Sequence, residues 1–370
     1  MKSLIQVHLF IIARLIVVAI GISLISACNS QRENDNPAAG SAASLNIALK
    51  NSIEQSILPG ITDFKTETEL LQTQVSSFCN AVNQSSLINL QNRWKTLSSQ
   101  WSRIVIYNIG PVNDDLIFPK VIFIESMRQR GTDYSDTVRA ELANILSDST
   151  VLDQNYFDNL TFTKVGILAL EILIFEDSNG IHSTELTDIV NDYQSNSRKC
   201  EYLNGISQLL HRHASYIQNG WETEHLDTNK AFKNILIDGE LEDGSESVPK
   251  LITAIQEHLD YLKKRKLEVI LDAQIANYFY QNVIATLDEI ETLLQGQDDE
   301  IYSFYDHMSG GGFDDVIELI NTNINLARLA ANNQSRSELT SAIGILDGNF
   351  KREVPDSLNV ILGINFSDGD

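Results

Sequence analysis

One acidic side chain of this 370-residue chain stands in a strongly apolar stretch. Glu171 lies within residues 165–175 (VGILALEILIF), where every other residue is apolar or glycine. On a helix, Leu168, Glu171 and Phe175 share one face. A carboxylate in such surroundings must find a hydrogen-bond partner, pair with a cation or stay protonated. Glu171 is therefore either a satisfied structural acid or a catalytic or binding residue in a buried cleft.

A second candidate is the pair His182 and Glu185, in residues 180–185 (GIHSTE). His and Glu three residues apart on one helix face could hold a metal ion. The pair follows Asp177-Ser178-Asn179, which is typical of a loop, so a position on the surface is the alternative. The sequence contains no HExxH motif, no serine nucleophile elbow and no phosphate-binding glycine loop. Metal ligands remain unassigned, with Glu171, His182 and Glu185 as weak candidates.

The N-terminus predicts export and lipid anchoring. Residues 1–27 have a basic start and a short apolar run, as a secretory signal does, and the run is shorter than a transmembrane helix needs. The run ends in Ile25-Ser26-Ala27-Cys28, which resembles the bacterial lipobox, so we expect cleavage before Cys28 and lipidation of its thiol. The alternative is an ordinary signal with a chance cysteine. Asn29 favours sorting to the periplasmic face of the outer membrane, with residues 28–44 as a flexible tether.

Two further cysteines, Cys79 and Cys200, would lie in an oxidising compartment. An even number of cysteines in such a place favours a disulfide between them. Two free buried thiols, or a redox or metal-binding pair, remain as alternatives, and the sequence has no CxxC motif to support the latter.

The elements that would position these residues are helices. Proline is scarce, with 6 residues in all, and residues 120–248 and 250–354 contain none. Apolar residues repeat with a helical period from Leu267 to Leu294, ahead of a possible C-terminal cap at Gly296. The pattern predicts helices at residues 45–57, 64–82, 87–109, 137–146, 161–175, 185–191, 198–221, 248–263, 267–294, 313–331 and 335–351. Ser44 is a possible N-cap, and residues 58–60 (LPG) predict a stop.

These helices predict an all-α fold in two parts. The acidic, glycine-containing stretch at residues 238–247 separates a bundle at residues 45–240 from one at residues 248–370, each antiparallel because most connections are short. The formal net charge of −23 argues against nucleic acid as a partner.

Several segments, taken in order, resemble the imelysin family, also called peptidase family M75. They are Trp94 and Trp101 ahead of residues 107–111 (YNIGP), residues 166–175 (GILALEILIF), residues 200–221, Lys266-Leu267 and the C-terminal residues 362–370 (LGINFSDGD). The resemblance implies two fused antiparallel helical bundles with a functional cleft between them, in the cell envelope. It also implies one of the family's roles: metallopeptidase, iron-regulated or iron-uptake protein, or polysaccharide binder.

This chain departs from the family pattern at two positions. Leu168 stands where the GxHxxE motif has histidine, and Val105 stands where a glutamate is often found. We therefore expect a non-catalytic envelope lipoprotein that binds a ligand or metal, with a link to iron uptake. The alternatives are a metallopeptidase with substitute ligands and a polysaccharide binder. A divalent metal or iron is the possible cofactor, and the partners are the outer membrane and an unknown ligand or protein.

Overall fold

The computed structural model describes residues 42–128, 131–177, 185–270, 275–298 and 300–362. Over this part of the chain all regular structure is helical, and there is no β-strand. The all-α fold predicted from the helical period and the scarcity of proline is confirmed. The predicted signal and most of the predicted tether lie outside the described residues.

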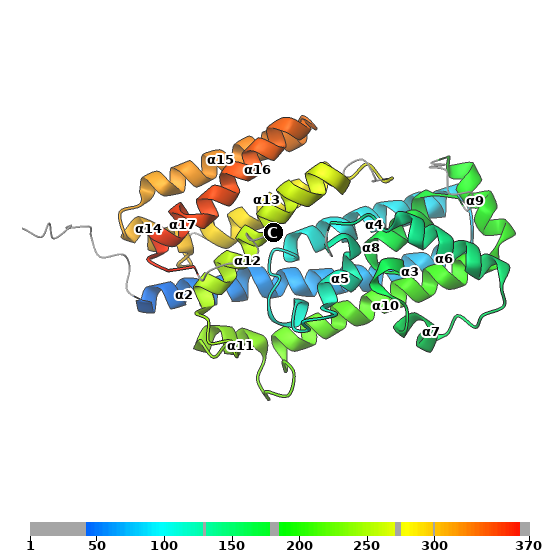
Figure 1. Ribbon diagram of the computed structural model, residues 1–370, viewed down its shortest axis with the longest axis horizontal. Helices are drawn as coiled ribbons and strands as arrows, with labels where there is room; N and C mark the ends of the chain where they lie inside the picture. Colours follow the sequence, from blue (N-terminus) through cyan, green and yellow to red (C-terminus); the bar gives the residue numbers. More distant parts are fainter. Residues whose placement is uncertain (1–41, 129–130, 178–184, 271–274, 299, 363–370) are drawn as a thin grey trace, which may run out of the picture.

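The first half is built on three long helices, α3, α4 and α10, which run alongside one another (Figure 1). Its helices are α2 (Ala42–Ser52), α3 (Leu58–Asn80), α4 (Gln84–Ile104), α5 (Lys120–Ile124), α6 (Ser135–Ser147), α7 (Gln154–Asp158), α8 (Gly166–Phe175), α9 (Leu186–Ser195), α10 (Ser197–Glu222) and α11 (Phe232–Asp238). Along α4, Leu90, Trp94, Leu97 and Trp101 recur every three or four residues and are buried. This spacing makes one face of α4 apolar and turns it toward the core.

The second half packs directly on the first. Its helices are α12 (Ser247–Tyr261), α13 (Phe279–Gln295), α14 (Phe304–Gly310), α15 (Asp314–Asn332), α16 (Arg336–Lys351) and α17 (Glu353–Leu358). Helix α13 lies against α4, and α14 lies against α2. The buried apolar residues of both halves form one continuous core. The two halves are therefore fused through a shared core, as the family resemblance implied.

The predicted stop at residues 58–60 is wrong. A π-helical turn, η1 (Ile53–Ile57), joins α2 to α3 without a break, and Pro59 lies in the first turn of α3. Proline lacks an N–H and crowds the carbonyl four residues before it, and the wider π turn relieves both problems. Ser44 also lies inside α2 instead of capping a helix, because α2 already begins at Ala42.

The predicted continuous helix at residues 267–294 is interrupted. A π-helix, η5 (Leu262–Ile270), extends α12, and α13 begins only at Phe279. Between them, Ile275 and Ala276 are not helical. Their backbone N–H groups donate to Glu171 of α8, so a contact distant in sequence overrides the local helical period. The predicted C-cap Gly296 is confirmed, with a φ of 85° and its N–H bonded to the carbonyl of Thr292.

Other boundaries differ by a few residues. Helix α4 ends at Ile104 instead of residue 109, and α8 begins at Gly166 after a short 3-10 turn at Phe162–Lys164. The helices of five to seven residues, α5, α7, α11, α14 and α17, were not predicted, because so few residues cannot show a helical period.

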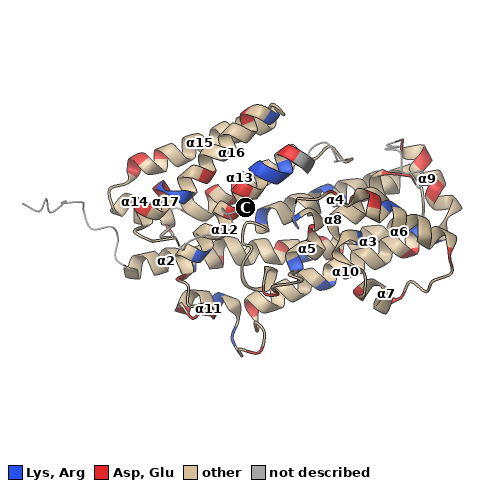
Figure 2. Cartoon of the chain, in the orientation of Figure 1, with Lys and Arg blue, Asp and Glu red and all other residues tan. Residues whose placement is uncertain are grey.

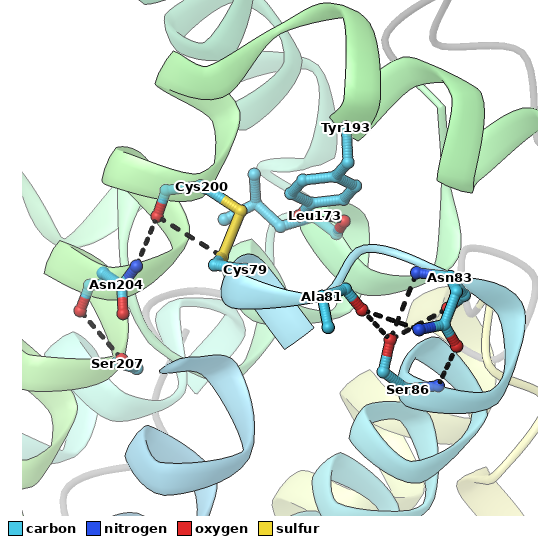
Figure 3. Close-up of a disulfide and its surroundings, with 9 residues drawn as sticks. All are labelled: Cys79, Ala81, Asn83, Ser86, Leu173, Tyr193, Cys200, Asn204 and Ser207. Carbon is cyan, nitrogen blue, oxygen red and sulfur yellow. Dashed lines mark hydrogen bonds between the residues drawn. A yellow bond between two sulfur atoms is a disulfide. The ribbon is translucent and has the colours of Figure 1, made fainter. Parts of the chain in front are cut away.

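A disulfide joins Cys79, at the end of α3, to Cys200, at the start of α10 (Figure 3). The S–S distance is 2.14 Å and the Cα atoms are 5.8 Å apart. Nearby, the hydroxyl of Tyr193 donates to the carbonyl of Leu173 in α8, at 2.7 Å. The end of the first half where α3 ends and α10 begins is thus held by the disulfide and by the buried hydrogen bond from Tyr193 of α9 to α8.

Charge is distributed unevenly over the surface. Acidic residues are spread over most helices, whereas four consecutive basic residues, 263–266, gather on η5 (Figure 2). Of these, the Lys264 side chain is 49% exposed, but that of Lys266 is only 16% exposed and turns inward. Among the described helices, none has the length and apolar character needed to cross a bilayer.

Candidate functional site

A cavity of about 60 Å³ lies where the two halves meet. The first half contributes α4, α8 and residues 125–127, and the second contributes η5 and α13. The cavity is lined by Trp94, Ser98, Trp101, Ser102, Glu125, Ser126, Met127, Ile167, Leu168, Glu171, Lys266 and Asn282. Ile167, Lys266 and Asn282 are partly exposed, so the cavity reaches solvent on their side.

Glu171 is 4% exposed and joins the two halves. Its Oε1 accepts hydrogen bonds from the backbone N–H groups of Ile275, at 3.1 Å, and Ala276, at 2.9 Å. The pKa of Glu171 is raised to about 7, chiefly by burial. The two backbone hydrogen bonds act to lower this pKa, and the charges of Glu176 and Asp133 act to raise it. Both the neutral and the ionised form are therefore accessible near neutral pH.

Helix α8 reaches this position because it begins at a glycine. Gly166 has a φ of +79°, and a Cβ atom there would lie 2.4 Å from the backbone oxygen of Ile124. Only glycine allows such an approach of α8 to the end of α5. The indole N–H of Trp94 then donates to the carbonyl of Ile167, at 3.2 Å, which ties the start of α8 to α4.

A buried ion pair forms another wall of the cavity. Lys266 pairs with Oε1 of Glu125, and the indole N–H of Trp101 donates to Oε2 of Glu125, at 2.9 Å. Burial acts to raise the pKa of Glu125, but the charges of Lys266 and Arg128 and the hydrogen bonds from Lys266 and Trp101 together hold this pKa below its usual value. Glu125 therefore carries a charge that Lys266 neutralises at close range.

Behind this pair lies a buried histidine that does not face the cavity. Nδ1 of His258 lies 2.7 Å from a guanidinium nitrogen of Arg128, which also stacks 4.5 Å above the ring of Tyr261. Burial, together with the charges of Arg128 and Lys266, holds the pKa of His258 well below its usual value. His258 is therefore a neutral acceptor that fixes Arg128.

The cavity does not suit a catalytic zinc ion. Such sites use three protein ligands, usually including histidine, and among the described residues the cavity offers only the carboxylates of Glu171 and Glu125. Glu125 is already held by Lys266 and Trp101, and Leu168 occupies the position from which an imidazole would reach Glu171. Across the described parts of the chain, no three His, Cys, Asp or Glu residues are grouped so that they could hold a metal.

The other residues singled out from the sequence do not join this cavity. Glu185 is exposed at the start of α9 and is not among the lining residues. His182 and the predicted lipidation site Cys28 lie outside the described residues. Val105 is buried and caps the end of α4.

Two cavity residues were not identified as site residues from the sequence. Glu125 ends the apolar run of residues 121–124 (VIFI), which is the same signal that pointed to Glu171. In the sequence, Lys266 was noted only as part of a segment that resembles the family. Its partner could not be foreseen, because η5 and α5 lie far apart along the chain.

Comparison with known proteins agrees with this architecture. A family model for imelysin (peptidase M75) matches residues 57–324. An imelysin-like protein from Psychrobacter arcticum 273-4 has a similar structure, with a TM-score of 0.64 and 16% identity over 88% of this chain and 98% of that one.

A protein from Parabacteroides distasonis ATCC 8503, described provisionally as an iron-regulated protein A precursor, has a TM-score of 0.57 and 12% identity over 85% of this chain and 96% of its own. At such identities the likeness shows the fold alone. No curated protein matches the sequence. The family model covers well over half of the chain, and the chain therefore belongs to the imelysin family.

Proposed function

We propose that this protein is a cell-envelope lipoprotein that binds a small ligand in the cavity between its two halves and does not cleave peptides. The observation that carries the proposal is the set of groups around Glu171. The described residues that line the cavity include two tryptophans, three serines, one asparagine and a lysine, but no histidine or cysteine. This mixture of aromatic surface and a few polar groups is typical of a ligand site.

The proposed location is supported by the N-terminal sequence. The lipobox-like residues 25–28 support lipidation of Cys28, and Asn29 supports sorting to the outer membrane. The description of the Parabacteroides protein as iron-regulated supports a link to iron supply. The described lining residues offer two carboxylates, and Lys266 and Trp101 already hold one of them. We therefore propose that this link acts through regulation or a partner protein, and not through an iron ion held by these side chains.

The catalytic question is tested with a peptide library. The purified protein, supplied in turn with zinc, manganese or ferrous iron, is incubated with the library, and products are identified by mass spectrometry. We expect no cleavage beyond that of a heat-denatured control. Cleavage that a chelator and Glu171→Gln both abolish, but that the surface variant Glu185→Gln retains, would show a peptidase and overturn the proposal.

The anchor is tested in intact bacterial cells. Incorporation of a labelled fatty acid and fractionation with the outer membrane are expected for the wild-type protein and are expected to be lost in Cys28→Ala. Equal labelling of the two proteins would contradict lipidation at Cys28. A matched Cys79→Ala/Cys200→Ala variant should keep the label, since those cysteines are bonded to each other.

A further inference from the structure

Two oxygen atoms of the cavity lack a hydrogen-bond partner within the described residues. The Ser126 side chain is 1% exposed, and its hydroxyl has no partner. Glu171 makes its two hydrogen bonds through Oε1, which leaves Oε2 without one. Buried oxygen atoms are normally paired, so the Ser126 hydroxyl is suited to receive a donor from outside the chain. Oε2 of Glu171 is not fully buried, and its lone pairs are open to the same donor.

The aromatic walls present ring surface and no free donor. The indole N–H of Trp94 is bonded to the Ile167 carbonyl, and that of Trp101 is bonded to Glu125. What remains for a ligand is the carbon surface of both rings. The faces of indole rings attract cations and pack well on alkyl groups.

The charges on the wall favour a cation. Lys266 neutralises Glu125, whereas no cation pairs with Glu171 in the described residues. The acidic groups that raise the pKa of Glu171 are Glu176, which follows α8 and pairs with Arg139, and Asp133 in the loop before α6. An anion entering the cavity would be repelled by Glu171, and a cation would complete its charge balance.

The size of the cavity limits the ligand. About 60 Å³ holds roughly four to six water molecules, at about 10–15 Å³ for each. The head group of a small molecule fits in this space.

We propose that the cavity binds the head group of a small primary ammonium compound, whose N–H groups donate to Oε2 of Glu171 and to the Ser126 hydroxyl while Trp94 and Trp101 pack around its first carbon. This inference rests on the ligand-binding role proposed above and names the ligand class.

The experiment uses methylammonium as the probe and acetate as the opposite-charge control, at constant ionic strength. The chain has three tryptophans, so ¹⁵N-tryptophan labelling of the full chain gives three indole N–H signals. Trp94 and Trp101 line the cavity and Trp221 does not, which makes Trp221 an internal control. We expect methylammonium to shift the first two signals with saturation and to leave the third unchanged.

The pH dependence identifies the group that binds. Methylammonium should bind about tenfold more weakly at pH 6 than at pH 8, because the ionised fraction of Glu171 falls with its pKa near 7. Glu125, with its lowered pKa, and neutral His258 do not change charge in this range. Glu171→Gln should abolish binding, Ser126→Ala should weaken it several-fold, and Glu185→Gln should bind as the wild type does.

Three results would overturn the inference. The first is that acetate binds with saturation and binds more tightly as the pH falls. The second is that methylammonium still binds to both Glu171→Gln and Ser126→Ala. The third is that methylammonium causes no saturable shift at pH 8. Glycerol, an uncharged probe, distinguishes a failure of the ammonium assignment from a failure of the proposed ligand-binding function. If glycerol shifts Trp94 and Trp101 and methylammonium does not, the cavity is still a ligand site and only the ammonium class is wrong.

Discussion

The carboxylate of Glu171 accepts a hydrogen bond from the backbone N–H of Ala276, 105 residues further along the chain, at 2.9 Å. This bond connects α8 of the first half to the segment that precedes α13 of the second half. It forms where the helix that the sequence pattern predicts is interrupted. The same carboxylate therefore shapes the cavity and fixes the backbone of the opposite wall.

The bond predicts different outcomes for two substitutions of Glu171. Glu171→Gln keeps a side-chain oxygen that can accept from Ile275 and Ala276, so at pH 4.5, where Glu171 is neutral in the folded protein, we expect a change in the free energy of unfolding below about 1 kcal/mol. Glu171→Leu leaves both buried N–H groups without an acceptor and should destabilise the protein by about 2–4 kcal/mol. Urea unfolding followed by circular dichroism measures both values. Equal stability of the Leu and Gln variants would show that the two backbone bonds contribute nothing.

The raised pKa of Glu171 predicts a pH dependence of stability. The folded-state pKa near 7 exceeds the ordinary value of 4.5, so between these pH values the folded protein binds more protons than the unfolded chain. Stability from this group is complete below about pH 4.5 and is lost as the pH rises through 7, by about 3 kcal/mol in total. Unfolding of the wild type and of Glu171→Gln between pH 4.5 and pH 8 isolates the effect. Parallel curves for the two proteins would contradict it.

The ion pair of Glu125 and Lys266 predicts that removing one partner is worse than removing both. Lys266→Met leaves a buried carboxylate without its nearest cation, and we expect a loss of about 3–5 kcal/mol in stability. Glu125→Gln combined with Lys266→Met should recover most of that loss. Lys264→Met is the control, because Lys264 is exposed on the same π-helix and should change stability by less than about 0.5 kcal/mol. A double variant as unstable as Lys266→Met would contradict the pairing.

The sequence predicted those features that rest on local pattern. The all-α class, the long helices and the cap at Gly296 follow from period and composition, and Glu171 was identified from an acid in an apolar run. The interruption before α13 and the Glu125–Lys266 pair could not be predicted, because each depends on contacts between segments far apart in the chain. The continuation of the helix through Pro59 was missed because a π turn has no sequence signal of its own.

The disulfide predicts a large loss of stability on its removal. Cys79 and Cys200 are 121 residues apart, so the bond closes a long loop and restricts the unfolded chain strongly. Cys79→Ala/Cys200→Ala should lower the free energy of unfolding by about 2–5 kcal/mol. A thiol reductant should destabilise the wild type by a similar amount and leave the double variant unchanged. Equal sensitivity of both proteins to the reductant would show that the bond does not form in solution.

The start of α8 predicts that alanine cannot replace glycine there. Gly166→Ala adds a Cβ atom 2.4 Å from the backbone oxygen of Ile124, at a φ of +79°. The control is Gly239→Ala. Gly239 has a similar φ of +69°, but a Cβ atom there would have no neighbour within 4 Å. The control substitution should therefore cost only the backbone strain of about 1–2 kcal/mol. We expect Gly166→Ala to cost at least about 1 kcal/mol more, because the backbone oxygen cannot move aside as a flexible side chain would. It should also shift the indole N–H signal of Trp94, which is bonded to Ile167 of α8, and Gly239→Ala should not. Equal costs for the two variants would mean that α8 does not need this close approach to α5 in order to bring Glu171 to the cavity.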